Sequence, residues 1–150
     1  MSGDGVIRKF STEMMPACRD LFIEVFNGEP WNDTWTRETA GARLREFVDC
    51  GRFFGFTLWE GEVLAGAVFC HGSTYCKGEE VFIDELFVSP AHRRKGYGKM
   101  LMKEVETHAK AQGHASITLL TNKGYPSHGF FKGQGYRESG FMVFMFKKII

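Results

Sequence analysis

The chain has 150 residues, of which 43% are hydrophobic and 25% charged, which is enough for one domain with a buried core. Its 19 Lys and Arg against 18 Asp and Glu give a formal net charge of +1, which excludes a global attraction to nucleic acid. The apolar runs are too short to cross a bilayer, and the first residues lack the basic and apolar pattern of a signal peptide. We therefore expect a single domain over residues 1–150, located in the cytoplasm.

The four cysteines agree with a reducing compartment, since none belongs to a Cys-x-x-Cys pair. Cys70, His71 and Cys76 lie close in sequence and offer metal-ligating atoms. They span a strand end and a Gly-Ser-rich loop, and a fourth ligand is not evident, so we expect no metal site.

The first half of the chain predicts one strand, two helices and a hairpin. Apolar residues recur at helical spacing in both helices, and Gly51 ends the second. Glu60-Gly61-Glu62 is a tight hairpin signal between two strands. The expected elements are a strand over 6–10, a helix from Ser11 or Thr12 to 26, a loop over 27–33, a helix over 36–50, and strands over 53–59 and 63–70.

The second half predicts a strand, a helix and a strand that fit a parallel crossover, followed by a short helix and a terminal hairpin. The expected elements are a flexible connection over 72–78, a strand over 81–88, a helix over 99–111, a strand over 116–121, a helix over 127–134, and a hairpin over 136–148 that turns near Ser139-Gly140. This order predicts an α/β, or α+β layered, domain. It has a mixed, largely antiparallel sheet of six to seven strands with helices on both faces.

Between the strand at 81–88 and the helix at 99–111 lies Arg93-Arg94-Lys95-Gly96-Tyr97-Gly98, hereafter the Arg93–Gly98 loop. A helix start offers unpaired N–H groups and positive potential, and glycine lets the backbone approach a ligand closely. The loop therefore favours a pyrophosphate site. Its glycines match neither the dinucleotide fingerprint nor a P-loop, so an ordinary surface or a nucleic-acid patch are alternatives on spacing alone.

The segment Val88–Gly98 resembles the signature of the GNAT superfamily of N-acetyltransferases, Gln/Arg-x-x-Gly-x-Gly/Ala after a strand that ends in valine. Arg93, Gly96 and Gly98 fill its three fixed positions. The segment Phe130–Tyr136 resembles the Phe-Tyr-x-x-x-Gly-Phe segment of the same family. The resemblance is specific from about residue 81 to 136. It implies a GNAT-like sheet that splays between its fourth and fifth strands, where the pantetheine arm of acetyl-CoA lies.

The resemblance also implies acetyl-CoA as co-substrate, held at its pyrophosphate by backbone amides of the Arg93–Gly98 loop. Members of the family are often dimers, so a homodimer is an expectation of the same kind. Backbone groups of the fourth strand near its end are expected to bind pantetheine amides. The residues implied in coenzyme binding are Leu86, Phe87, Val88, Arg93, Arg94, Lys95, Gly96, Tyr97, Gly98, Lys99, Asn122 and Phe131.

Acetyl transfer to an amine requires a neutral amine, a polarised thioester carbonyl and a proton for the leaving thiolate. Asp84 is the candidate base, because many family members carry a His, Glu or Asp at this position of the fourth strand. Ile83-Asp84-Glu85 resembles the Ile-Asp-Gln of some aminoglycoside 6′-N-acetyltransferases. Glu85, which strand alternation places on the opposite face, is the second candidate. Either residue has a structural alternative: Asp84 as a buried acid bonded to backbone, and Glu85 as the partner of a cation.

The proton donor to the thiolate departs from the family pattern. The family often has a tyrosine where this chain has Phe131, which has no proton to donate. Tyr125 in the preceding loop is the candidate replacement, and water is the alternative because a thiol is already fairly acidic. Tyr125 is otherwise a loop aromatic that covers the core. Asn122 lies about two residues from the family's asparagine that contacts CoA.

The amine acceptor is expected to bind at the loop between the first two helices and at 72–78. Glu29, Trp31 and Asp33, with Trp35, combine acidic and indole groups, which suit an ammonium ion through charge and cation–π attraction. The two tryptophans alternatively anchor the loop on the core. The leading hypothesis is an N-acetyltransferase for a small, aminoglycoside-like or protein amine. A non-catalytic acyl-CoA-binding module and a nucleic-acid-binding protein are the alternatives; neither nucleic acid nor a membrane is an expected partner.

Overall fold

The structure, a computed structural model, describes residues 4–150 and divides the chain into two compact units. The first unit ends at Leu120 and holds the sheet, and the second unit is Thr121–Ile150. That residues 1–150 act as one functional domain stays a prediction.

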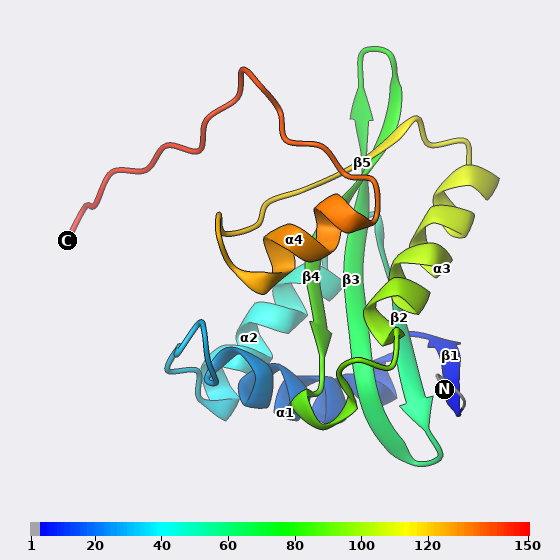
Figure 1. The fold of residues 1–150 in the computed structure, drawn as a ribbon, viewed down its shortest axis with the longest axis vertical. Coiled ribbons are helices and arrows are strands. Elements are labelled where there is room, and N and C mark those ends of the chain that lie inside the picture. Colours follow the sequence, from blue (N-terminus) through cyan, green and yellow to red (C-terminus); the bar gives the residue numbers. More distant parts are fainter. Residues whose placement is uncertain (1–3) are drawn as a thin grey trace. The chain divides into compact units, whose positions relative to one another are not determined.

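The first unit contains five strands, three α-helices and two short 3-10 helices (Figure 1). Their order is β1 (Gly5–Lys9), η1 (Thr12–Met14), α1 (Met15–Phe26), α2 (Arg37–Val48), β2 (Phe53–Glu60), β3 (Val63–Tyr75), β4 (Gly78–Val88), η2 (Pro90–His92), α3 (Tyr97–Ala111) and β5 (Ser116–Leu119). The predicted elements of this half are confirmed, with ends that differ by a few residues.

The five strands form one sheet in sequence order, antiparallel from β1 to β4 and parallel between β4 and β5. The predicted parallel crossover through α3 is therefore confirmed. Helices α1 and α2 lie on one face of the sheet and α3 on the other (Figure 1). The fold is thus the three-layer α/β arrangement that the element order predicts, and the sheet is open at both edges.

The main core lies between the sheet and the two N-terminal helices. Phe22 of α1 and Leu44 of α2 are almost completely buried there, against Phe69 of β3 and Phe87 of β4. The rings of Phe22 and Phe87 meet edge to face, with centroids 5.6 Å apart. Because Phe69 and Phe87 are packed in this core, β3 and β4 give rigid support to the side chains near the end of β4.

Local sequence explains where α2 begins. Thr36 caps the helix: its hydroxyl accepts from the backbone N–H of Thr39 at 3.0 Å, and the Thr39 hydroxyl accepts from the N–H of Thr36 at 2.9 Å. This reciprocal pair is a capping box built with threonine in place of the usual glutamate. The first helix instead starts through the short turn η1, and Ser11 makes no side-chain capping bond.

The predicted flexible connection over 72–78 is wrong. Strand β3 continues to Tyr75 and β4 begins at Gly78, so Cys76 and Lys77 alone make the turn of a long hairpin. Strand pairing extends to Tyr75 opposite Gly78. Gly72 and Ser73, which composition assigned to a loop, are held in the ladder because the pairing of β3 with β4 outweighs their low strand propensity.

In the second unit, α4 (Pro126–Gly133) follows Tyr125 and agrees with the predicted short helix. The predicted hairpin over 136–148 is not formed in the described chain, and the sheet therefore has five strands instead of six or seven. From Phe141 onward the tail's large apolar side chains are exposed. A two-stranded hairpin is marginal in water unless a further strand or a helix covers its apolar face.

Among residues 4–150, no helix is both long and apolar enough to cross a membrane.

Candidate active site

The Arg93–Gly98 loop leads from the end of β4 into α3. Gly96 precedes the helix in the left-handed region, with φ of 78°, and no side chain caps the helix start. The first N–H that bonds back into the helix is that of Met100, to the Gly96 carbonyl at 3.0 Å. The N–H groups of the first turn before it have no partner within the helix, as at every helix start. This end of α3 therefore presents backbone donors and positive potential to an anion.

Arg94 also has a positive φ, of 66°, although it carries a side chain. A non-glycine residue in this region costs about 1–2 kcal/mol, so other contacts must hold the loop in this shape. Arg93, Arg94 and Lys99 are exposed on both sides of Gly96. Their charge is available to an anion bound at the loop.

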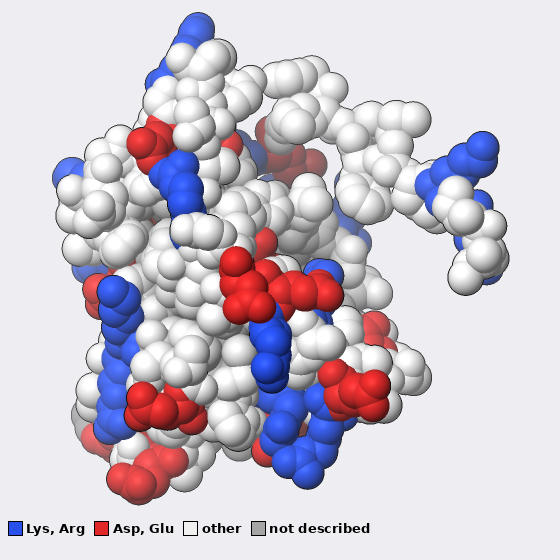
Figure 2. Space-filling model, turned by 180° about the vertical axis from the view of Figure 1, so that it is seen from behind, with Lys and Arg blue, Asp and Glu red and all other residues white. Residues whose placement is uncertain are grey.

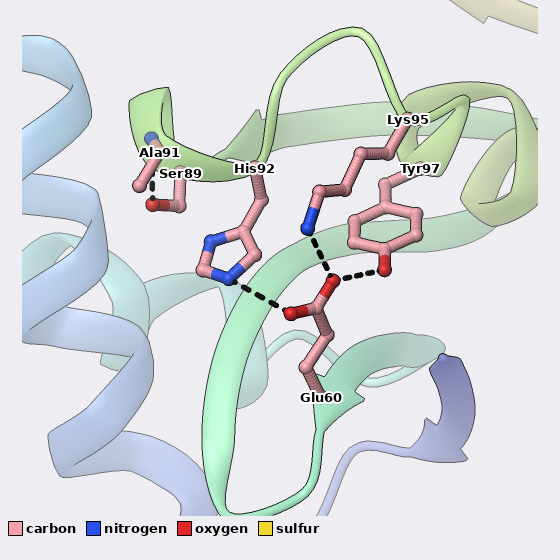
Figure 3. Close-up of polar contacts among 6 residues, drawn as sticks. All are labelled: Glu60, Ser89, Ala91, His92, Lys95 and Tyr97. Carbon is pink, nitrogen blue, oxygen red and sulfur yellow. Dashed lines mark hydrogen bonds and ion pairs between the residues drawn. The ribbon is translucent and has the colours of Figure 1, made fainter. Parts of the chain in front are cut away.

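The side chains of Lys95 and Tyr97 turn away from that exposed side, toward Glu60 at the end of β2 (Figure 3). Tyr97 is 2% exposed, so any coenzyme contact from it is left to its main chain. Lys95 Nζ lies 2.9 Å from Glu60 Oε2. The sequence grouped both residues with the coenzyme contacts, and the structure gives their side chains a different partner.

The end of β4 has an unpaired edge on the side of β5. Within the described residues, β4 pairs with β5 only from Glu80 to Ile83, whereas it continues to Val88. The two strands thus separate near Asp84, as the resemblance implied. Leu86, Phe87 and Val88 still pair with β3 on their other side. Their remaining backbone groups can bind an extended ligand in the manner of an added strand.

Asp84 forms a hydrogen bond with His71 on the neighbouring strand. Its Oδ2 lies 2.8 Å from Nδ1 of His71, and the Asp84 side chain is only 9% exposed. An ionised carboxylate only accepts, so Nδ1 carries the proton and Nε2 is the second ring nitrogen. Burial raises the pKa of Asp84, while the hydrogen bond and charge of His71 oppose that rise. A carboxylate with a raised pKa is a better proton acceptor at neutral pH.

Glu85 lies on the same face as Asp84, so the prediction that it points to the opposite face is wrong. The strand register explains this, because Phe69 pairs with Glu85 and Cys70 pairs with Ile83, which leaves Asp84 as an extra residue on β4. Such a bulge breaks the alternation of side chains. Phe69 and His71 face the α1–α2 layer, and they bring Glu85 and Asp84 to that layer with them.

Arg43 of α2 is the cation beside these two carboxylates. Its Nη2 lies 3.7 Å from Glu85 Oε2, and its guanidinium lies over the ring of Phe47 at 4.8 Å. Burial nevertheless raises the pKa of Glu85 to about 7, because Arg43 only partly offsets the loss of water. Asp84 and Asp33 add to the rise through charge repulsion. Glu85 is therefore partly protonated at neutral pH.

The loop between α1 and α2 carries the predicted acceptor residues. Asp33 is exposed and accepts a hydrogen bond from the indole of Trp35 at 3.0 Å. The ring of Trp31 packs on Phe26, with centroids 5.0 Å apart, and that of Trp35 packs on Phe22 at 5.0 Å. Both tryptophans therefore anchor the loop on the core, the alternative role that the sequence left open. Glu29 is exposed in the same loop.

Asn122, Tyr125 and Phe131 belong to the second unit, where only their local surroundings are described. The Tyr125 N–H donates to the carbonyl of Asn122 at 3.2 Å, and Tyr125 precedes α4. Phe131 is buried and lies edge to face with Tyr136 at 5.7 Å. Roles for these residues in coenzyme binding and catalysis stay predictions.

On the face of the molecule turned away from the viewer in Figure 1, basic and acidic side chains lie interspersed (Figure 2). Neither sign of charge forms a broad patch on that face. Among residues 4–150, no three His, Cys, Asp or Glu side chains gather in a way that could hold a metal ion.

Comparison with protein families gives a match between residues 15–136 and the Acetyltransferase (GNAT) family. The match includes the Arg93–Gly98 loop, β4 and α4. The chain belongs to this family of N-acetyltransferases. Among curated proteins, aminoglycoside N(6′)-acetyltransferase type 1 of Acinetobacter haemolyticus is 34% identical over 82 residues. That alignment covers 50% of this chain and 55% of the relative, so the chain matches about half of the relative's length.

Solved structures of other acetyltransferases share the fold of this GNAT protein. Aminoglycoside N-acetyltransferase AAC(6′)-Iy in complex with CoA has a TM-score of 0.76 at 20% identity, over 97% of this chain and 95% of that one. An aminoglycoside acetyltransferase from an uncultured soil metagenomic sample, in complex with sisomicin, has a TM-score of 0.73 at 16% identity, over 98% and 97%. Identities this low establish the fold and nothing further.

Three residues of the site were missed by sequence reasoning, His71, Arg43 and Glu60. His71 was considered only as a metal ligand. The signal that could have placed His71 beside Asp84 is its position near the end of a strand that pairs with the strand of Asp84. Arg43 and Glu60 gave no signal, because each reaches its partner from an element distant in sequence.

Proposed function

We propose that this protein is an acetyl-CoA-dependent N-acetyltransferase that moves the acetyl group directly to a primary amine in a ternary complex. The observation that carries the proposal is the Arg93–Gly98 loop. A left-handed Gly96 and an uncapped helix start present backbone N–H groups next to exposed arginines. Family membership and a CoA complex of a protein with the same fold support acetyl-CoA as the ligand of this loop.

In the proposed reaction, Asp84 accepts a proton from the acceptor's ammonium group, and His71 holds the carboxylate in place. The neutral amine then attacks the thioester carbonyl, so that a C–N bond forms and the C–S bond breaks. The amine nitrogen loses its second proton to water, and the CoA thiolate leaves and takes a proton from water or from Tyr125. Water suffices as donor, because a thiol with a pKa of about 8.5 is a good leaving group. Holding both substrates together supplies much of the acceleration.

Glu85 is the second candidate base. Its pKa of about 7 is suited to accept a proton at neutral pH. The contact with Arg43, however, engages its carboxylate with a permanent cation, whereas the partner of Asp84 is the imidazole of His71. We therefore assign the proton transfer to Asp84 and a supporting negative charge to Glu85.

We propose an amino sugar or a related small polyamine as acceptor. The alignment with an aminoglycoside N(6′)-acetyltransferase supports this class, as does the fold shared with a protein bound to sisomicin. The carboxylates of Asp33, Asp84 and Glu85 suit a polycation, because they lie near enough to interact. The charges of Asp84 and Asp33 both raise the pKa of Glu85. A protein amine is the alternative acceptor.

The test is turnover of acetyl-CoA, followed as free thiol, over a panel of aminoglycosides, simple diamines and peptides with free amino groups. Thiol release that depends on an aminoglycoside supports the proposal, and release with peptides alone moves the acceptor to a protein amine. Tight CoA binding without release for any amine identifies an acyl-CoA-binding module, the alternative that Phe131 favours. Failure to bind CoA overturns the whole proposal.

A further inference from the structure

Glu60 joins the end of β2 to the Arg93–Gly98 loop and to the residue just before it (Figure 3). Its Oε2 accepts from the Lys95 ammonium at 2.9 Å and from the Tyr97 hydroxyl, and its Oε1 lies 3.3 Å from His92 Nε2. One carboxylate thus contacts three side chains from a stretch of six residues. These contacts cross 32 to 37 residues of sequence, from the β2–β3 hairpin to the start of α3.

The three contacts lie on both sides of the two left-handed residues. Arg94 falls between His92 and Lys95, and Gly96 falls between Lys95 and Tyr97. The loop shape that exposes the backbone N–H groups is unfavourable for Arg94, so it persists only where its surroundings hold it. Glu60 contacts the chain at His92, two residues before Arg94, at Lys95 between the two left-handed residues, and at Tyr97 directly after Gly96.

The chemistry of the contacts shows that the carboxylate is ionised. The Tyr97 hydroxyl and the Lys95 ammonium lower the pKa of Glu60, in that order of importance. The same bond raises the pKa of Tyr97 to about 12, so Tyr97 remains a donor. His92 Nδ1 is buried and has no hydrogen-bond partner, which leaves Nε2 as the nitrogen that carries the proton toward Glu60.

We propose that Glu60 is a positioning residue for the coenzyme, which holds the Arg93–Gly98 loop in the shape that binds the pyrophosphate. This inference rests on the proposed function of the loop. It also assigns Lys95 to Glu60 instead of the phosphates. The anion is then bound by backbone N–H groups of the first turn of α3, with Arg93 and Arg94 as the cations nearby.

The experiment measures the affinity for CoA by calorimetry in wild type, Glu60→Ala and Glu60→Gln, with Glu62→Gln as matched control. Glu62 is an exposed acid of the same hairpin, and its removal changes the net charge as Glu60→Gln does. We expect Glu60→Ala to bind CoA about tenfold more weakly, since ordering a strained loop costs a factor of roughly 5 to 30 in affinity. Glu60→Gln keeps an acceptor for Tyr97 and loses less, and Glu62→Gln binds as wild type does.

A kinetic readout separates positioning from general loss of structure. With the acceptor at saturation, Glu60→Ala raises the KM for acetyl-CoA and leaves kcat close to wild type, because the reacting groups on β4 are untouched. Unchanged CoA affinity in Glu60→Ala overturns the inference. Tighter binding overturns it as well, since that outcome means that Lys95 is released to the phosphates. If wild type binds no CoA, the proposed function fails instead.

Discussion

Glu85 makes the stability of this protein depend on pH in a way that one substitution removes. The side chain is 17% exposed, and burial raises its pKa from 4.5 to about 7. The folded protein therefore binds the Glu85 proton more tightly than the unfolded chain. Stability is unaffected by this group below pH 4.5, falls as the pH rises from 4.5 to 7, and stays reduced above 7. The full penalty is roughly 3 kcal/mol.

Glu85→Gln removes the charge and keeps the shape. We expect the variant to be nearly as stable as wild type at pH 5 and more stable at pH 8. The difference in unfolding free energy between variant and wild type changes by about 2.5 kcal/mol between these two pH values. The lost contact with Arg43 subtracts only about 0–1 kcal/mol, since Arg43 is 45% exposed.

The assay is urea denaturation of wild type and Glu85→Gln at pH 5 and pH 8, with Glu62→Gln as control. The difference in unfolding free energy between the two proteins is compared at the two pH values, so the pH dependence of the groups that both proteins contain cancels. The control removes an acid that lies in water and leaves the pH dependence as in wild type. An equal stability difference for Glu85→Gln at both pH values refutes the reasoning, because it means that the Glu85 carboxylate is as well solvated as in the unfolded chain.

Three further outcomes are expected. Asp84→Asn lowers kcat for acetyl transfer with little change in CoA affinity, and the residual activity loses its dependence on pH; a variant as active as wild type at every pH removes Asp84 from the mechanism. His71→Ala shifts the acid limb of the pH–rate profile and leaves the KM for acetyl-CoA unchanged, whereas a purely structural His71 changes only the unfolding midpoint. Gly96→Val weakens CoA binding, because a β-branched residue is strained at φ of 78° and its side chain points into open space beside the loop, so unchanged affinity counts against the loop as the coenzyme site.

The sequence by itself determined the elements whose signals are local. Hydrophobic periodicity located α1, α2 and α3, and the strand–glycine loop–helix pattern located the uncapped start of α3. The identity of the family came from the same pattern. The terminal hairpin was predicted from equally local signals and did not form, since a hairpin depends on the surface that covers it.

Only the tertiary structure decided which groups meet. A bulge at Asp84 brought Glu85 to the same face, and pairing of β3 with β4 put His71 against Asp84, thirteen residues away in sequence. The contact of Glu60 with Lys95 spans 35 residues. Such contacts depend on register and packing between distant segments, and a register shifted by one residue turns every side chain of a strand to the other face. A single sequence carries no local signal for that choice.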